Sequence, residues 1–410
     1  MHQLNPRTAS RLLSVTRRPA WPPAAGRDSS APLNVPVYEA ELWTSRQRQA
    51  SSIHEISYRA CFKPQLPAYF IERLTQEGDL VYDPFSGRGT TAIEAALRAR
   101  PIAANDVNPL SSILTRPRLE LPSIADIDAR LRTLKFAARP RSGLDLSMFF
   151  HPDTEYEILG LREHLYRRLM SGEEDAVDRW IRMVATNRLT GHSPGFFSVY
   201  TLPPNQAVAP EDQLRINARL KQEPEYRDIR ALIRKKSLQL QGRLTAADRW
   251  RLRAAAPGAR LLLNDAATTP EIASGSVQLT VTSPPFLDVV QYARDNWLRC
   301  WFNGLDAEAV NARITMSRTL EEWARAMAAV LQELYRATRP GGWVAFEVGE
   351  VRRGEVRLEE TVVPLGIEAG FDCFAILINS QRFTKTANIW GVKNNRLGTN
   401  SNRIVLLRKP

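Results

Sequence analysis

Cysteine is scarce in this chain. Only three cysteines occur among 410 residues, Cys61, Cys300 and Cys373, and they are widely separated, without a C-x-x-C pair. The sequence therefore indicates neither a disulfide framework nor a zinc site, and we expect no metal cofactor. Unpaired cysteines of this kind are typical of a protein in the reducing cytoplasm.

Long apolar runs are also missing. No run approaches the roughly 20 residues that a membrane-spanning helix needs, so we expect no membrane partner. The hydrophobic residues, 43% of the chain, are nevertheless ample for a large core with an inserted second lobe.

Lysine is rare although the chain is basic. The net charge is +12, and only eight of the 56 basic residues are lysines, which leaves 48 arginines. Arginine suits bidentate contacts to phosphate and to guanine, and a basic surface would neutralise phosphates. A GC-rich genome would give the same bias without any function. The composition therefore agrees with a nucleic-acid partner but does not require one.

The most informative segment is TVTSPPF. The residues Val277 to Thr282 alternate and then run apolar with β-branched side chains, which predicts a strand that ends just before Ser283. In open α/β sheets, ligands bind at that edge. Pro284 and Pro285 lack N–H donors, so Ser283 and the Pro284 carbonyl could accept both protons of an amino group, while Phe286 offers a stacking face. An ordinary turn after a strand explains the same residues.

A second segment, DPFSGRGTTAIEAALRAR, spans Asp83 to Arg100 and predicts a strand, a glycine turn and a helix. Gly87 and Gly89 permit close backbone approach to a ligand, and Thr90 and Thr91 can cap the helix start. The segment lacks the third glycine of the dinucleotide fingerprint. It also lacks the Gly-Lys-Ser/Thr end of a P-loop, which disfavours ATP hydrolysis.

The residues Pro101 to Asp106 predict a second strand that ends in an acid. A carboxylate at this place offers two acceptors to a ribose diol. The glycine turn and this acid together indicate a nucleotide-type site.

The segments DPFSGRGTT, NDVNP and TSPPF together resemble the S-adenosylmethionine-dependent amino-methyltransferases of DNA. The resemblance runs from about His54 to Pro410, and its specific motifs cover a fraction of that span. It implies an α/β fold with the Rossmann-like class I methyltransferase sheet, mostly parallel with an antiparallel last strand, and a largely helical insert. The apolar segments Trp343 to Val348, Phe371 to Ile378 and Ile404 to Leu407 would complete the sheet.

The resemblance also implies a substrate and a cofactor. Serine before Pro-Pro is typical of the cytosine-N4 enzymes and aspartate of the adenine-N6 enzymes, so Ser283, Pro284, Pro285 and Phe286 would hold the N4 amine of a flipped-out cytosine in double-stranded DNA. Phe286 replaces the commoner tyrosine and keeps the stacking face. Adenine N6 and RNA remain alternative substrates. Carbon-5 methylation is set aside, because it needs a Pro-Cys nucleophile and none of the three cysteines follows a proline.

The cofactor, S-adenosyl-L-methionine, is expected to contact several residues that match family positions. Asp83, Phe85, Gly87 and Gly89 match the segment around its methionine part, and Asp106 matches the acid that holds the ribose. Asp265, in Asn264-Asp265-Ala266, matches the segment that meets adenine, although a capping Asp explains it equally well. The expected cofactor residues are Phe62, Lys63, Asp83, Phe85, Gly87, Gly89, Thr90, Thr91, Asp106 and Asp265.

We divide the chain into a flexible basic N-terminal arm (1–45), a catalytic domain (46–117 and 257–410) and a helical insert (118–256) in the position of a target-recognition region. The arm, with five arginines before the first glutamate, could also be a transit peptide. Enzymes of this type are chiefly bacterial, so we expect a cytoplasmic, nucleoid-associated protein, with a cognate restriction endonuclease as a further candidate partner.

DNA contacts are hypothesised at two places. One is the segment before the last strand, rich in Asn, Thr and basic residues, and the other is a charged helix of the insert. Solvated turns and helix faces explain both equally. The residues are Lys385, Asn388, Trp390, Lys393, Asn402, Arg234, Lys235 and Lys236.

Overall fold

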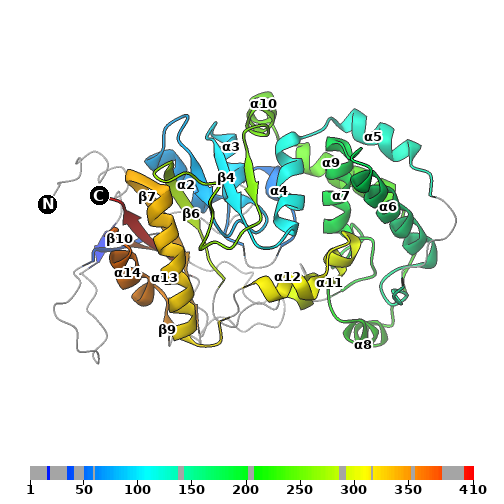
Figure 1. Cartoon of the computed structure of the whole chain (residues 1–410). Coiled ribbons are helices and arrows are strands. Elements are labelled where there is room, and N and C mark those ends of the chain that lie inside the picture. Colours follow the sequence, from blue (N-terminus) through cyan, green and yellow to red (C-terminus); the bar gives the residue numbers. More distant parts are fainter. Residues whose placement is uncertain are drawn as a thin grey trace.

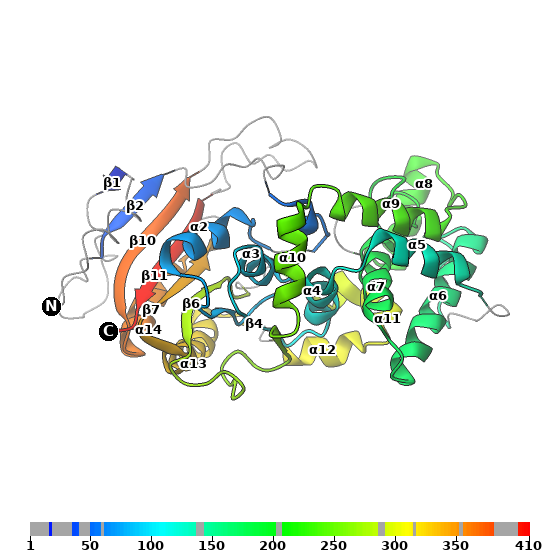
Figure 2. The same cartoon turned by 90° about the horizontal axis from the view of Figure 1, so that it is seen from above.

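The computed structural model describes residues 16–18, 35–40, 50–58, 61–136, 143–201, 207–285, 292–314, 317–351, 356–380 and 401–410. Figures 1 and 2 show an elongated molecule with a sheet and its helices toward one end and a group of helices at the other.

Among the described residues, the strands of this sheet number nine and have the order β1-β2-β10-β11-β7-β6-β3-β4-β5. The strands from β7 to β5 are parallel to one another, and β11 runs antiparallel between β7 and β10. The strands are β1 (Thr16–Arg18), β2 (Val37–Ala40), β3 (Val81–Asp83), β4 (Ile102–Asn105), β5 (Arg260–Leu262), β6 (Val277–Thr282), β7 (Thr338–Val348), β10 (Asp372–Ser380) and β11 (Ser401–Arg408), with β8 (Glu350–Val351) and β9 (Val356–Arg357) as a separate pair.

The predicted fold class, a Rossmann-like α/β sheet with an antiparallel last strand and a largely helical insert, is confirmed by this order. The antiparallel strand does not lie at the sheet edge, because β10 and β2 continue the sheet beyond it.

Helices cover both faces of the sheet. The described helices, including those at the other end of the molecule, are α2 (Gln65–Leu74), α3 (Thr90–Leu97), α4 (Leu110–Glu120), α5 (Ile124–Thr133), α6 (Pro152–Met170), α7 (Ala176–Arg188), α8 (Pro210–Leu220), α9 (Ile229–Gln241), α10 (Ala246–Ala255), α11 (Tyr292–Phe302), α12 (Ala307–Arg313), α13 (Leu320–Ala337) and α14 (Glu359–Glu368), preceded by the 3-10 turn η2 (Ser52–His54).

Side chains of the strands alternate between two apolar clusters, as the pleat of a sheet requires. In β7, Trp343 and Ala345 pack with α2 and α3 in one cluster. Their neighbours Val344 and Phe346 pack with α13 and α14 in the other. The sheet is therefore buried on both faces, which explains the near-continuous apolar segments of its parallel strands.

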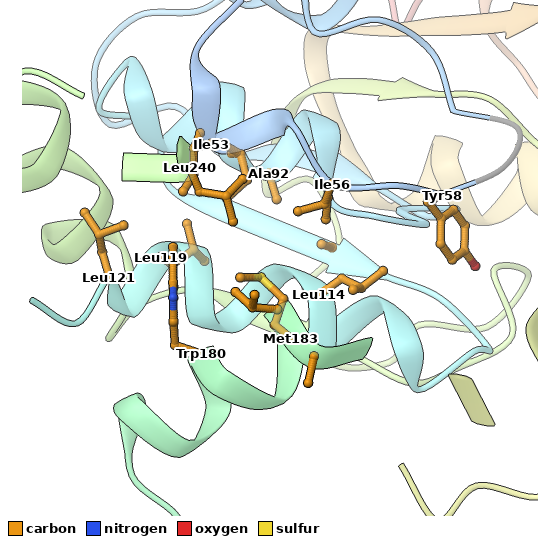
Figure 3. Packing of buried hydrophobic residues seen from close by; sticks show 14 of the residues in the cluster. Ile53, Ile56, Tyr58, Ala92, Leu114, Leu119, Leu121, Trp180, Met183 and Leu240 are labelled. Atoms are coloured by element: carbon orange, nitrogen blue, oxygen red, sulfur yellow. The ribbon is translucent and has the colours of Figure 1, made fainter. Parts of the chain in front are cut away.

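The helices α5 to α9 lie at the end of the molecule away from β10 and β11 (Figures 1 and 2). They share the cluster on the α2–α3 face, in which Trp180 and Met183 of α7 pack near Leu114 and Leu119 of α4 (Figure 3). The insert and the sheet are thus joined by continuous apolar packing.

Two short strands fall within residues 1–45, the segment expected to form a flexible arm. β2 pairs in parallel with β10, and β1 pairs with β2, so these residues extend the sheet. Among the described residues, no helix is both long and apolar enough to cross a bilayer.

Candidate functional site

The ends of three parallel strands are tied together by one buried amide, Asn105. This residue ends β4 and has no exposed surface. Its Nδ2 donates to the carbonyls of Pro84 (3.3 Å) and Asn264 (3.0 Å), and its Oδ1 accepts from the Asn264 N–H (2.9 Å). Asn105 thereby holds the loops after β3 and β5 at the carboxyl edge of the sheet, where ligands bind in folds of this class.

The glycine turn follows β3. Gly87 and Gly89 have φ angles of 51° and 73°, which disfavour residues with a β-carbon. A β-carbon at Gly89 would lie 2.1 Å from Thr115 Oγ1, so the turn also needs glycine for space. Gly89 is the N-cap of α3 and no side chain caps this helix.

The expected capping role of Thr90 and Thr91 was wrong. Both residues are already inside α3 and buried, so neither precedes the first turn. The Thr91 hydroxyl donates to the Val281 carbonyl of β6 (3.1 Å), and Thr90 Oγ1 accepts from Arg88 Nε (3.2 Å). They join the glycine turn to its neighbours.

Asp83 is a buried carboxylate with one unused oxygen. Its Oδ1 accepts from the Thr282 hydroxyl (2.7 Å) and from the Phe85 N–H (3.2 Å), whereas Oδ2 is buried without a hydrogen-bond partner. Burial raises the pKa of Asp83 to about 7, against the opposing effect of the hydrogen bond from Thr282. A cationic group beside Oδ2 would relieve the cost of burying this charge.

Asp106 connects the second strand to the glycine turn. Its Oδ2 accepts from the Gly87 N–H (2.8 Å) and its Oδ1 from the Asn108 N–H (2.9 Å). Burial raises the pKa of Asp106 to about 6, and both hydrogen bonds oppose that rise. A carboxylate has about four accepting positions, so Asp106 retains acceptors for hydroxyl groups.

The Ser-Pro-Pro turn begins directly after β6, as predicted. Ser283 is half-buried and Pro284 buried, and the Pro285 carbonyl accepts from the indole N–H of Trp323 on α13 (2.9 Å). The preceding residue, Thr282, bonds to Asp83, so one hydroxyl links this turn to the glycine segment. Phe286 lies outside the described residues.

The segment before α2 lies over the glycine turn. A β-carbon at Gly87 would be 3.6 Å from Tyr58 Cε1 and 3.8 Å from Cys61 Sγ. From this segment, Phe62 is half-buried and packs on the core, and burial lowers the pKa of Lys63. Tyr58 and Cys61 are thus the neighbours of Gly87 that the structure identifies.

A fully buried arginine fixes that segment in place. Arg118 of α4 donates to the carbonyls of Ile53 (3.4 Å), Leu114 (2.9 Å) and Arg88. Burial lowers the pKa of Arg118 to about 9. Because its partners lie before α2, in α4 and in the glycine turn, Arg118 holds all three in register.

Asp265 occupies an exposed loop after β5. Its Oδ1 accepts from the Ala267 N–H (2.9 Å), which is the turn-capping arrangement that the sequence also allowed. The second oxygen leaves capacity for a further donor.

The charged helix of the insert does not present one basic face. Arg234 and Lys235 are exposed on α9, and Arg234 pairs with Asp128 (3.0 Å). Lys236 turns inward and is 6% exposed. These three side chains therefore do not share one exposed face, because successive helix positions lie about 100° apart.

The other hypothesised DNA contacts, Lys385, Asn388, Trp390 and Lys393, lie outside the described residues, and Asn402 is described only by its backbone position in β11. Among the residues that the structure describes, no group of three or more His, Cys, Asp or Glu side chains is arranged to hold a metal ion.

Sequence reasoning missed three residues that organise this site: Asn105, Thr282 and Trp323. Asn105 and Thr282 immediately precede recognised positions, and polar residues at strand ends could have signalled them. Trp323 lies 38 positions from its partner Pro285, inside an amphipathic helix where a tryptophan indicates only core packing.

Residues 29–109 match the family model described as DNA methylase. The type II methyltransferase M.MjaII of Methanocaldococcus jannaschii is 30% identical over 77 residues, covering 18% of this chain and 14% of that protein. The type II methyltransferase M.MvaI of Kocuria varians is 25% identical over 128 residues, covering 30% of this chain and 25% of that protein. The chain thus matches a quarter or less of these relatives' lengths. The matched segments are similar to DNA methylases and type II methyltransferases, and the matches do not separate N4 from N6 specificity.

Solved structures include a Thermus thermophilus protein described as a DNA modification methylase and complexed with S-adenosyl-L-methionine. It is 24% identical and has a TM-score of 0.22, covering 36% of this chain and 54% of that chain. An rRNA methyltransferase of Streptomyces viridochromogenes is 12% identical, with a TM-score of 0.34, and covers 87% of this chain and 89% of that chain. The fold assignment rests on the strand order given above.

Proposed function

We propose that this chain is a DNA methyltransferase that transfers a methyl group from S-adenosyl-L-methionine to the N4 amine of a flipped-out cytosine. The observation that carries the proposal is the hydrogen bond between Thr282 and Asp83. It places the Ser-Pro-Pro turn, which suits an amine, beside the glycine turn and its two acids. In this proposal residues 46–117 and 257–410 form the catalytic domain, and 118–256 recognise the target.

The residues present fit the cofactor. Asp83 Oδ2 is a buried acceptor without a partner, which suits the ammonium of the methionine part. Asp106 retains acceptors for the ribose hydroxyls beside the N–H groups of Gly87 and Asn108 that it already accepts from. Phe85, Phe62, Lys63 and Asp265 stay candidates for the same ligand. When bound, the cofactor supplies an electrophilic methyl group.

Ser283 and Pro284 act on the amine. An exocyclic amine shares its lone pair with the ring, and accepting both of its protons would turn that lone pair out of conjugation. The Ser283 hydroxyl and the Pro284 carbonyl would accept these protons, while the bond from Trp323 holds the Pro285 carbonyl. Direct transfer then depends on positioning and electrostatics, without a covalent enzyme intermediate.

The proposed activity is tested by incubating the protein with duplex DNA and labelled cofactor, followed by nucleoside mass spectrometry. We expect N4-methylcytosine. Appearance of N6-methyladenine instead would replace the substrate assignment, and methylation of RNA alone would move the enzyme to another class. Absence of both cofactor binding and product would refute a methyltransferase.

Substitutions should separate the two halves of the site. Ser283→Ala is expected to lower kcat more than it weakens cofactor binding, because the hydroxyl meets only the acceptor amine. Asp106→Ala should do the reverse, because Asp106 shapes the glycine turn and the ribose subsite. Single-turnover rates and calorimetric titration with the cofactor measure the two quantities. Equal effects of both variants on both quantities would contradict these roles.

Trp323→Phe should lower kcat by about fivefold, because it removes a hydrogen bond worth about 1 kcal/mol that holds the Pro285 carbonyl. The dissociation constant of the cofactor should stay unchanged. Trp180→Phe is the matched control, since Trp180 also donates one indole hydrogen bond of 2.9 Å, to Ser237 in the insert. A similar fall in kcat for both variants would show that stability, not positioning, explains the loss.

A further inference from the structure

Several basic side chains come together in the insert beside the segment that covers the glycine turn. Arg188 ends α7, Lys236 lies on α9 and Arg299 on α11. Their exposed fractions are 8%, 6% and 7%. Burial lowers the pKa of Arg188 to about 10 and that of Lys236 to about 8, and the charges of Arg299 and Arg188, respectively, add to these shifts. The helices α7 and α9 pack together, since Trp180 of α7 donates to the Ser237 hydroxyl of α9 (2.9 Å).

The guanidinium of Arg188 is held in a fixed plane, with its terminal N–H groups available as donors among the described residues. Its guanidinium stacks on Phe196, with Cζ 3.9 Å from the ring centroid, and its Nε donates to the Asn187 carbonyl (2.9 Å). Its two terminal nitrogens make no hydrogen bond within the described ranges of the chain. The ring itself is held against Gly191, where a β-carbon would lie 2.5 Å from it. A stacked guanidinium with an open fork suits a bidentate oxyanion.

Lys236 adds a second cation with spare protons. Its Nζ donates to Gln239 Oε1 (3.0 Å), which uses one of three N–H bonds. The acids that act on this cluster are Glu55, which is exposed and accepts from Gln239 Nε2 (2.6 Å), and Asp295, whose charge partly opposes the lowering of the Arg299 pKa by burial. Burial of cations without close carboxylates is costly unless an anion joins them.

The cluster lies next to the candidate active site. Asn187, one residue before Arg188, accepts the Ser57 N–H at Oδ1 (2.6 Å). The following residue, Tyr58, lies against Gly87 and accepts a hydrogen bond from Asn108 Nδ2 at its hydroxyl (3.4 Å). An anion held by Arg188 would therefore be a near neighbour of the glycine turn.

We propose that Arg188 and Lys236 bind a backbone phosphate of the nucleic-acid substrate beside the target nucleotide. The inference rests on the proposed function for the identity of the substrate. Arg188 and Lys236 lie on packed helices, and each keeps N–H groups that make no hydrogen bond among the described residues, which matches the charge and the several acceptor oxygens of a phosphodiester. This proposal also gives a role to the folded loop around Phe196, because the Phe196 ring holds the Arg188 guanidinium that would contact the phosphate.

The test is the salt dependence of binding to a short fluorescent DNA duplex, measured without cofactor between about 50 and 200 mM KCl. Arg188→Gln and Lys236→Gln should each reduce the slope of log affinity against log salt by about 1, to a similar degree for unrelated duplex sequences. Arg188→Lys keeps one charge and should retain most of the slope. Arg339→Gln is the control, because Arg339 pairs with Asp79 at the opposite edge of the sheet, where β7 begins.

Unchanged slopes for folded Arg188→Gln and Lys236→Gln would overturn the proposal; if Arg188→Gln does not fold, Lys236→Gln alone decides. Weaker binding of S-adenosylhomocysteine with an unchanged DNA slope would assign the cluster to the cofactor carboxylate and overturn it too. The proposed activity is judged separately. If the variants reduce the salt slope but the native protein methylates nothing, the phosphate site stands and the methyltransferase is rejected. If the native protein methylates DNA but the variants leave the salt slope unchanged, the methyltransferase stands and the phosphate site is rejected.

Discussion

Asp83→Asn is expected to weaken the binding of S-adenosyl-L-methionine at pH 8 by about 10- to 100-fold, the range for losing one charged hydrogen bond. Asparagine keeps the acceptor that Thr282 and Phe85 use at Oδ1 and removes the negative charge at the partnerless Oδ2. Calorimetric titration measures the effect. Adenosine, which lacks the ammonium, should bind both proteins equally. Equal weakening for both ligands would mean that Asp83 acts only on the fold.

The same substitution should remove a pH dependence. Burial raises the pKa of Asp83 to about 7, so the charged form that a cation needs disappears below that pH. Between pH 8 and pH 6 the native protein should lose affinity, approaching tenfold for each pH unit below 7, whereas the variant should change little. Protonation of Asp106, whose pKa is raised to about 6, adds a further loss at lower pH in both proteins.

The stability of the ligand-free protein should depend on pH in the opposite sense. A carboxyl whose pKa is raised on folding binds its proton more tightly in the folded chain. Its contribution to stability is therefore present below the ordinary pKa of 3.8 and is lost as the pH rises through 7. At pH 8, Asp83→Asn should raise the unfolding temperature while it lowers cofactor affinity. A fall in both would contradict a ligand-binding role for the charge.

Gly89→Ala should destabilise the protein by about 2 to 5 kcal/mol, the sum of a left-handed alanine and an overpacked contact. Gly89 has φ 73°, and an added β-carbon would meet three side-chain atoms of Thr115 between 2.1 and 2.9 Å away. Thr115 is 1% exposed and cannot move aside easily. Denaturant unfolding monitored by tryptophan fluorescence gives the change in the free energy of unfolding.

A double-mutant cycle divides that cost. Thr115→Ala removes Oγ1 and Cγ2, the two atoms closest to the added carbon, and keeps Cβ at 2.9 Å, so the double variant should recover most of the steric part and keep the backbone strain of about 1 to 2 kcal/mol. Gly78→Ala is a matched control, because Gly78 also has positive φ (88°) but nothing within 4 Å. If Gly78→Ala costs as much as Gly89→Ala, the contact with Thr115 contributes nothing.

Local pattern was enough to place the strands and turns of the candidate site. β6 ends at Thr282, as predicted, and β4 ends at Asn105, one residue before the predicted end at Asp106. The pattern could not show which hydroxyl or amide spans two loops, since the Thr282–Asp83 and Asn105–Asn264 bonds join positions 199 and 159 residues apart. The pattern also failed where a side chain could face either the solvent or the core. Lys236 belongs to a charged run by sequence, and its inward position follows only from the helix phase that α9 adopts against the core.

The position of β11 has a consequence for synthesis. This strand pairs with β7 on one side and β10 on the other, so among the described strands β1, β2 and β10 join the rest of the sheet through it alone. A nascent chain that has emerged through residue 380 already contains the parallel strands and both turns of the candidate site, yet its N-terminal strands have no route to the sheet. Until residues 401–408 leave the ribosome, β7 presents an unpaired edge that a chaperone or another nascent chain could occupy.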